Sequence, residues 1–193
     1  MIRRLTDPIA ARLRNAATRA ASERRTIHGL EVWILNDGQF ASTEALFGTI
    51  GAALDLVARH APWRLNAMRR DFTRIFLLRM DGVRALLDAE RVCRLDTYFV
   101  AKFAAEQVAS SIVHEGVHAR LRRGGRSVPR DLIAWEERLC RKAELAFGLR
   151  LPNGAAVVER ARVSLTLPDH DVAPLAGNIQ LRQRRPRGPG RFA

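Results

Sequence analysis

A helical pattern that carries polar residues inside an apolar segment is the strongest constraint on this chain of 193 residues. It runs from Ala104 to about Arg122 and is followed by Gly124 and Gly125, which favour the left-handed conformation that closes helices. Its second half contains an H-E-x-x-H motif, His114 to His118. Buried histidines and carboxylates cost free energy unless they are hydrogen-bonded, so other parts of the fold must supply partners for this helix.

The spacing of the motif suits a zinc ion. Residues four apart lie on one face of a helix, with Cβ atoms about 5 to 6 Å apart, so His114 and His118 can converge on one tetrahedral cation. Glu115 lies beside them and can take a proton from a zinc-bound water, which is the general-base role in metal-assisted hydrolysis. The alternative is an ordinary surface pair of histidines without a metal.

The third ligand is expected on the next helix, which the pattern places from about Asp131 to Arg150. Glu is one known third ligand beside two histidines. We expect Glu137 in this role, because it shares a helical face with Cys140 and Glu144. Glu136 is rotated from Glu137 by about 100°. Glu144 is the reserve ligand, and it would otherwise orient a ligand histidine or pair with an arginine. Cys140 is expected to be a buried structural thiol.

Together, the segments Ile112–Leu121 and Glu137–Glu144 resemble the gluzincin clan of zinc metallopeptidases in its minimal forms. They are also similar to an uncharacterised bacterial family of small H-E-x-x-H proteins. The resemblance covers about residues 95 to 150. It implies that His114, His118 and Glu137 bind zinc and that Glu115 is the catalytic base.

The same resemblance implies an edge strand before the active helix, with which an extended peptide substrate pairs. A strand expected from Leu95 to Val100 is in the right place. The chain departs from thermolysin-like members at Arg141, where they have an acidic residue four positions after the ligand Glu. Tyr98 and His170 are candidates for stabilising the transition state.

Weaker patterns predict the remaining elements. We expect three further helices, from Asp7 to about Arg24, from Ser42 to a stop at Pro62, and from about Ala156 to Leu165. We also expect strands at Glu31–Leu35 and Phe72–Met80, with Arg84–Leu87 as a short hairpin partner of the second of these strands. This is an α+β fold: a small zincin-like domain over residues 1–181, with a short sheet packed against the H-E-x-x-H helix and the Glu-bearing helix. The basic segment Arg182–Ala193 is expected to be a disordered tail.

The charge of the chain offers a second interpretation. Lys and Arg number 33 against 20 Asp and Glu, a formal net charge of +13, which attracts anionic partners. A basic protein that binds nucleic acid or another anion, with a structural or vestigial metal site, is therefore the alternative to a hydrolase of peptide or protein substrates. Structural zinc is normally closed by four protein ligands, whereas the sequence offers three good ones.

Cysteine content and hydropathy indicate the compartment. Cys93 and Cys140 are the two cysteines, too few for a disulfide-rich scaffold, so a reducing, cytoplasmic location is expected. Nothing in the sequence reaches the length of a membrane span.

Overall fold

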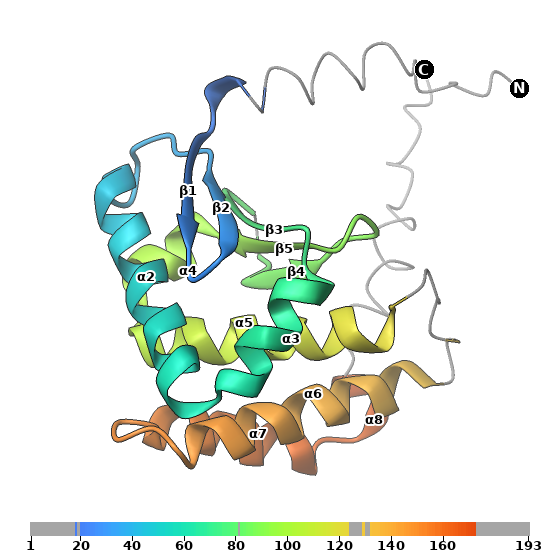
Figure 1. The fold of residues 1–193 in the computed structure, drawn as a ribbon. Coiled ribbons are helices and arrows are strands. Elements are labelled where there is room, and N and C mark those ends of the chain that lie inside the picture. Colours follow the sequence, from blue (N-terminus) through green and yellow to red (C-terminus); the bar gives the residue numbers. More distant parts are fainter. Residues whose placement is uncertain (1–17, 19, 81, 124–128, 130–131, 173–193) are drawn as a thin grey trace, which may run out of the picture.

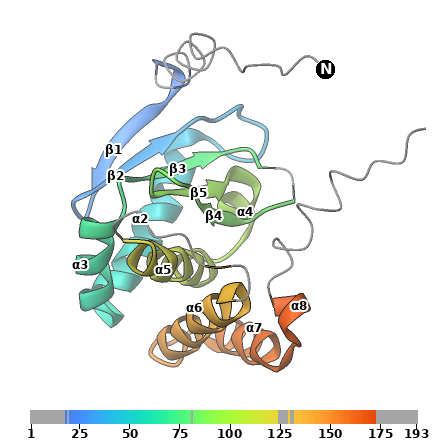
Figure 2. The same ribbon diagram turned by 90° about the vertical axis from the view of Figure 1, so that its right-hand side faces the viewer.

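The computed structural model describes residue 18 and residues 20–80, 82–123, 129 and 132–172. These residues form an α+β fold, as expected, in three layers (Figures 1 and 2). A five-stranded sheet lies on one side of the H-E-x-x-H helix, and the later helices lie on the other. Most of the helix expected from Asp7, and the whole of Arg182–Ala193, fall outside the described residues.

The sheet has the strand order β1-β2-β3-β5-β4. Its three central strands, β2, β3 and β5, are parallel, and the two edge strands, β1 and β4, are antiparallel to their neighbours. The strands are β1 (Glu23–Ile27), β2 (Leu30–Ile34), β3 (Arg74–Leu78), β4 (Ala85–Leu87) and β5 (Val92–Asp96). A tight turn joins β1 to β2, in which His28 and Gly29 have φ angles of 49° and 76°. The strands expected at Glu31–Leu35 and Phe72–Met80 are thus confirmed as β2 and β3.

Two sequence-based expectations about the sheet are wrong. The strand expected from Leu95 to Val100 ends at Asp96, because the Asp96 side chain accepts a hydrogen bond from the Phe99 N–H, 3.2 Å away, and so caps helix α4 (Thr97–Lys102). The edge strand beside the active helix is β4. The second wrong expectation concerns this strand: the sequence predicts that Arg84–Leu87 forms a hairpin with the strand at Phe72–Met80. Instead, β4 pairs with β5, which lies between β3 and β4.

The prediction that the first helix continues to about Arg24 is also wrong, because β1 begins at Glu23. Four of the five β1 side chains are exposed, so the strand carries no alternation of buried and exposed positions that would reveal it. Pairing with the buried strand β2 makes this segment extended.

Two helices connect β2 to β3. Helix α2 (Thr43–His60) begins where expected, with the Ser42 hydroxyl accepting a hydrogen bond from the Ala45 N–H at 3.2 Å. Pro62 ends α2 as expected, and it also starts a second helix, α3 (Pro62–Asp71), that the sequence analysis missed. Proline suits this first helical position because its missing N–H would have no partner there.

The H-E-x-x-H helix, α5 (Ala105–Leu121), and the following helix, α6 (Ile133–Gly148), confirm the two expected helices. The apolar face of α5, which includes Val108, Ile112 and Ala119, belongs to the main hydrophobic core. Its opposite face carries both motif histidines and contacts α6. Because Glu136 contacts His118 and Glu144 contacts His114, the two helices run antiparallel.

Helix α7 (Ala155–Thr166) confirms the last expected helix and packs on α6, and α8 (Asp169–Val172) follows it. The approach of α7 to α6 is close at Gly148, where an added Cβ would lie 2.8 Å from Val157 Cγ1. This contact fixes the position of α7 and of the side chains that it presents to α6. Within the described residues, no helix is long and apolar enough to cross a membrane.

The substitution Gly148→Ala should therefore destabilise the protein, by about 1 to 3 kcal/mol, because the methyl group overpacks the contact with α7. Gly51→Ala in α2 is the matched control: nothing lies within 4 Å of its added Cβ, and alanine should stabilise the helix by about 0.5 to 1 kcal/mol. Free energies of unfolding from urea titrations would measure both. Equal effects of the two substitutions would contradict the close packing of α7.

Candidate metal centre

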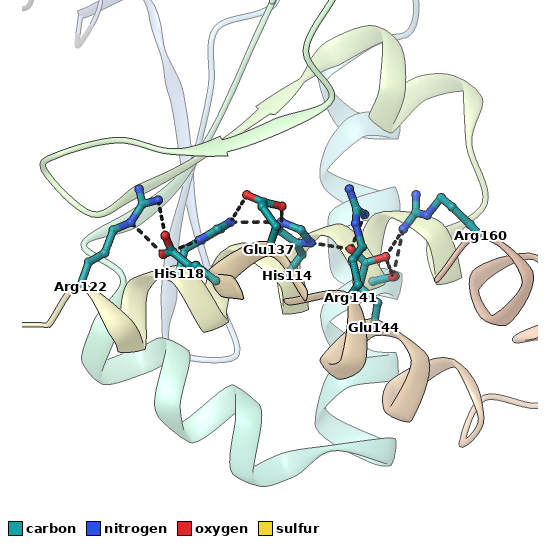
Figure 3. Close-up of polar contacts among 9 residues, drawn as sticks. His114, His118, Arg122, Glu137, Arg141, Glu144 and Arg160 are labelled. Carbon is teal, nitrogen blue, oxygen red and sulfur yellow. Dashed lines mark hydrogen bonds and ion pairs between the residues drawn. The ribbon is translucent and has the colours of Figure 1, made fainter. Parts of the chain in front are cut away.

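The two motif histidines and Glu137 meet at one point between α5 and α6 (Figure 3). The Nε2 atoms of His114 and His118 are 3.1 Å apart. The Glu137 carboxylate lies 3.3 Å from His114 Nε2 and 3.2 Å from His118 Nε2. Tetrahedral geometry with metal–ligand bonds near 2.0 Å requires ligand atoms about 3.3 Å apart. Oε2 of Glu137 gives the distance to His114 and Oε1 the distance to His118, so each histidine lies at about this spacing from one of the two carboxylate oxygens. The spacing is compatible with a tetrahedral metal site.

A second carboxylate holds each histidine by its other ring nitrogen. Glu144 Oε1 lies 2.6 Å from His114 Nδ1, and Glu136 Oε1 lies 2.7 Å from His118 Nδ1. When both Nδ1 atoms donate to these carboxylates, both Nε2 lone pairs are directed at the common point. Three electron-rich groups then face one another at close range. They require a cation between them, either a metal ion or protons.

The pKa values of the histidines show how strongly this position favours positive charge. Burial lowers the pKa of His114, but hydrogen bonds to Glu137 and Glu144 outweigh burial and raise it to about 10. The pKa of His118 is likewise lowered by burial, yet contacts with Cys140, Glu136 and Glu137 raise it to about 12. Without a metal ion, protons on the two imidazoles provide the positive charge.

Cys140 also belongs to the centre. Its thiol is free and fully buried, and its sulfur, together with one ligand atom from each of His114 and His118, forms a group in which all atoms lie within 4.8 Å of one another. This buried His-His-Cys group could hold a metal ion. The sequence analysis treated Cys140 as a structural thiol. Its position one helical turn after Glu137, on the same face, was the signal that it lies at the metal site.

Glu136 is closer to the centre than the sequence analysis expected. It is completely buried, and it accepts hydrogen bonds from His118 and from Arg122 Nε at 3.0 Å. The buried stripe of α6 is centred on Cys140, and Glu136, four residues earlier, lies on the same face. Its rotation away from Glu137 therefore brings it toward His118 instead of toward solvent. Glu144 contacts His114 Nδ1 and can orient its ring, which is one of the alternative roles that its position in the sequence suggested.

Glu115 differs from the other carboxylates of the centre. It is 5% exposed, and no hydrogen bond or ion pair joins it to another described residue. Burial raises its pKa, against the smaller opposing effect of positive charge on His114 and His118. A buried carboxylate with a raised pKa and no structural partner is suited to accept and release a proton.

The two residues considered for transition-state stabilisation lie elsewhere. Tyr98, on α4, packs edge-on against Phe40, with ring centroids 5.1 Å apart. His170, on α8, has a side chain that is 79% exposed and lies 3.5 Å from Asp171. Within the described residues, no hydrogen bond, ion pair or ring contact joins either of them to a histidine of the motif. The structure therefore offers no support for a role of either residue at the centre.

No protein-family model, curated protein or solved structure matches this chain. Its function has to be inferred from the geometry of the centre itself.

A divalent metal that binds at this centre must displace at least one proton, because the surrounding carboxylates raise the pKa of both histidines. The apparent zinc affinity should therefore rise by about tenfold per pH unit for each proton displaced. Calorimetry at pH 6 to 8, in buffers with different ionisation enthalpies, would count the protons released. A zinc affinity that does not change with pH would contradict this assignment of charge.

Proposed function

We propose that this chain is a zinc-dependent hydrolase, most specifically a small metallopeptidase with a zincin-like, gluzincin-type centre. One observation carries the proposal: the two motif Nε2 atoms and the Glu137 carboxylate meet at 3.1 to 3.3 Å. A chance pair of surface histidines would have neither this convergence nor a buried carboxylate behind each ring.

The donor set fits zinc. Imidazole nitrogen and carboxylate oxygen are common zinc ligands, and tetrahedral sites that combine nitrogen with sulfur also favour this metal. In the proposed centre, His114, His118 and Glu137 hold the ion, while Glu136 and Glu144 orient the two histidines. Three protein ligands leave one coordination position for substrate chemistry, as in catalytic zinc sites.

The residues of the chain divide the chemistry of hydrolysis among them. Zinc, when bound, polarises a carbonyl group and lowers the pKa of water. Glu115 takes the proton from the attacking water as oxygen bonds to the substrate carbon, and it returns that proton to the leaving nitrogen as the C–N bond breaks. Its raised pKa supports this role, because a base works best when its pKa lies near the pH of the reaction.

The neighbouring edge strand supports a peptide as substrate. Strand β4 packs against α5 and pairs with β5 on one side; its other side pairs with no strand in the described part of the chain. An extended peptide can add to such an edge through main-chain hydrogen bonds. In the proposed complex, this pairing places a peptide bond beside the H-E-x-x-H helix.

A structural metal site in a basic anion-binding protein is the second candidate, and Cys140 is the observation that favours it. If the Cys140 sulfur joins the two histidines and Glu137, the site has four protein ligands and is closed. The net charge of +13 agrees with an anionic partner. The two candidates differ in which of Glu137 and Cys140 the metal needs.

The purified protein should contain about one zinc per chain, and His114→Ala or His118→Ala should remove it. Glu137→Ala should weaken zinc binding by more than about a hundredfold, whereas Cys140→Ser should weaken it by no more than about ten- to a hundredfold, because we expect the thiol to contact His118 from outside the ligand set. Elemental analysis and competition with a chelator would measure both effects. Failure to load any transition metal would refute the metal centre. Loss of zinc in Cys140→Ser as severe as in His118→Ala would instead indicate the closed structural site.

The substitution Glu115→Gln should retain zinc and abolish hydrolysis, because the amide has nearly the shape of the carboxylate but cannot take a proton from water. Cleavage of a mixed peptide library, followed by mass spectrometry, would compare this variant with the unmutated protein at equal zinc content. Equal cleavage by the two proteins would remove Glu115 from the mechanism.

A further inference from the structure

The five-stranded sheet carries a second, smaller apolar cluster on the face turned away from α5, here called the outer face. Its members come from β2, β3 and β5 and from the residue after β2: Trp33, Leu35, Phe76, Leu78 and Val92. The residues that alternate with them, such as Val32 and Ile75, belong to the main core with α2 and α5, so the two clusters lie on opposite faces of the sheet. No helix residue of the described chain belongs to the smaller cluster, and α5 and the later helices lie on the other side of the sheet (Figure 2). Parallel strands are normally covered on both faces, so the outer face needs a different cover.

Arginine side chains lie over the outer face. In the strand register, one row across the sheet consists of Arg24, Trp33, Phe76 and Arg94. The Cζ atoms of Arg24 and Arg74 lie 4.1 Å and 4.3 Å from the centre of the Trp33 ring, and Arg94 Cζ lies 5.7 Å from the centre of the Phe76 ring. Trp33 and Phe76 are themselves buried, at 8% and 6% exposed. The outer face thus presents planar cations that rest on aromatic rings.

Positive charge exceeds negative charge in this layer of the described chain. Arg94 is paired with Asp88 at 2.8 Å, and Glu31 is exposed on the same face as Trp33, so two carboxylates face three arginines. Arg74 is the unsatisfied member: its Nε is buried without a hydrogen-bond partner, and no hydrogen bond or ion pair joins its side chain to another described residue. A guanidinium group in this state is stabilised when an anionic oxygen binds to it.

The charge of the layer limits the kind of partner that can cover it. Residues 1–17 contain four arginines and one acidic residue, and residues 173–193 contain five arginines and no acidic residue. Either terminal segment, or a second copy of this chain with its net charge of +13, would add like charge to the layer. A lipid surface draws much of its affinity from inserted apolar side chains, whereas the rings here are buried. The partner that fits is an anion with planar groups that can stack on guanidinium planes.

We propose that the outer face of the sheet binds single-stranded nucleic acid, with phosphate oxygens at Arg74 and bases stacked on the arginine planes. RNA and single-stranded DNA share this chemistry, because both combine phosphates with unpaired bases that stack on aromatic rings and guanidinium groups. The paired bases of a duplex have no free faces for such stacking. The inference goes beyond the proposed hydrolase, since it concerns the opposite face of the sheet and requires no metal.

Four probes, titrated with the full chain, separate the candidate partners. Labelled poly-uridine RNA and poly-thymidine DNA of about 12 nucleotides represent the two single strands, within the range that one domain binds. A labelled DNA duplex and vesicles of phosphatidylserine with phosphatidylcholine represent the other anionic partners. Anisotropy follows the nucleic acids, and cosedimentation follows the vesicles. We expect both single strands to bind in a way that depends on Arg74, and the tighter of the two identifies the source of the strand.

Arg74→Gln is the informative variant, because Arg74 holds no carboxylate of the described chain. It should weaken single-strand binding by at least about fivefold and reduce the slope of log K against log salt by about 0.7, the value for one lost phosphate contact. Arg24→Gln, at an exposed position on the edge strand, should weaken binding by a similar factor. Arg162→Gln is the matched control: it removes the same charge from an exposed position on α7 and should leave binding within about twofold. Zinc content should be unchanged in all three variants.

Trp33 provides a readout at the face itself. Trp63→Phe and Trp135→Phe remove the other two tryptophans of the chain, which are 51% and 52% exposed. In this double variant, saturating RNA or DNA should quench or shift the emission of Trp33, because a strand bound over the face changes the surroundings of its indole ring.

Absence of measurable binding to either single strand would overturn the proposal. Equal losses in Arg74→Gln and Arg162→Gln would also overturn it, because they would show a diffuse effect of charge. Unchanged Trp33 emission in a protein that binds the strand would place the strand elsewhere. Binding of duplex or vesicles that depends on Arg74, without such dependence for the single strands, would assign the face to that other partner. Loss of single-strand binding in Arg74→Gln and Arg24→Gln, with retention in Arg162→Gln, would support the proposal whether or not the chain takes up zinc.

Discussion

The pairing of two buried histidines on α5 with three carboxylates on α6 is the interaction on which the helical layers depend. Isolated buried charges cost several kcal/mol each, so groups of this kind persist inside a protein when opposite charges surround them. Here the charges alternate along one row between the helices: Arg122, Glu136, His118, Glu137, His114, Glu144 and finally Arg141 with Arg160 (Figure 3). The row fixes the register of α6 on α5, and Arg160 extends it to α7.

The row is complete only when a cation lies at its middle. His114 Nε2, His118 Nε2 and the Glu137 carboxylate all present electron pairs to the same point. Protons can provide the cation, as the raised pKa values of both histidines show, but a metal ion would satisfy all three groups at once. Metal binding should then stabilise the contact between α5 and α6 as well as form a site, because ligand binding to the folded state adds to its stability.

Sequence reasoning could predict the parts of this arrangement that follow from the period of a helix. The i, i+4 spacing of His114 and His118 places both rings on one face, and the same period aligns Glu137 with Glu144. It could not decide how α6 is rotated about its axis, and that rotation determines why Glu136 and Cys140 also face the centre. Strand β1 and helix α4 were missed for a related reason. Pairing with β2 and capping by Asp96 determine those segments, and neither leaves a periodic pattern.

The difference between an open and a closed metal site turns on Glu115 and Cys140. With both histidines, Glu137 and the Cys140 sulfur as ligands, a structural site is complete and gains nothing from Glu115. Yet Glu115 is buried beside it, without a hydrogen bond from another described residue and with a raised pKa, a combination that costs stability. Groups that cost stability without a structural partner are expected at functional sites. In the proposed hydrolase, proton transfer in an open site accounts for the burial of Glu115 next to the histidines, and a closed structural site gives it no role.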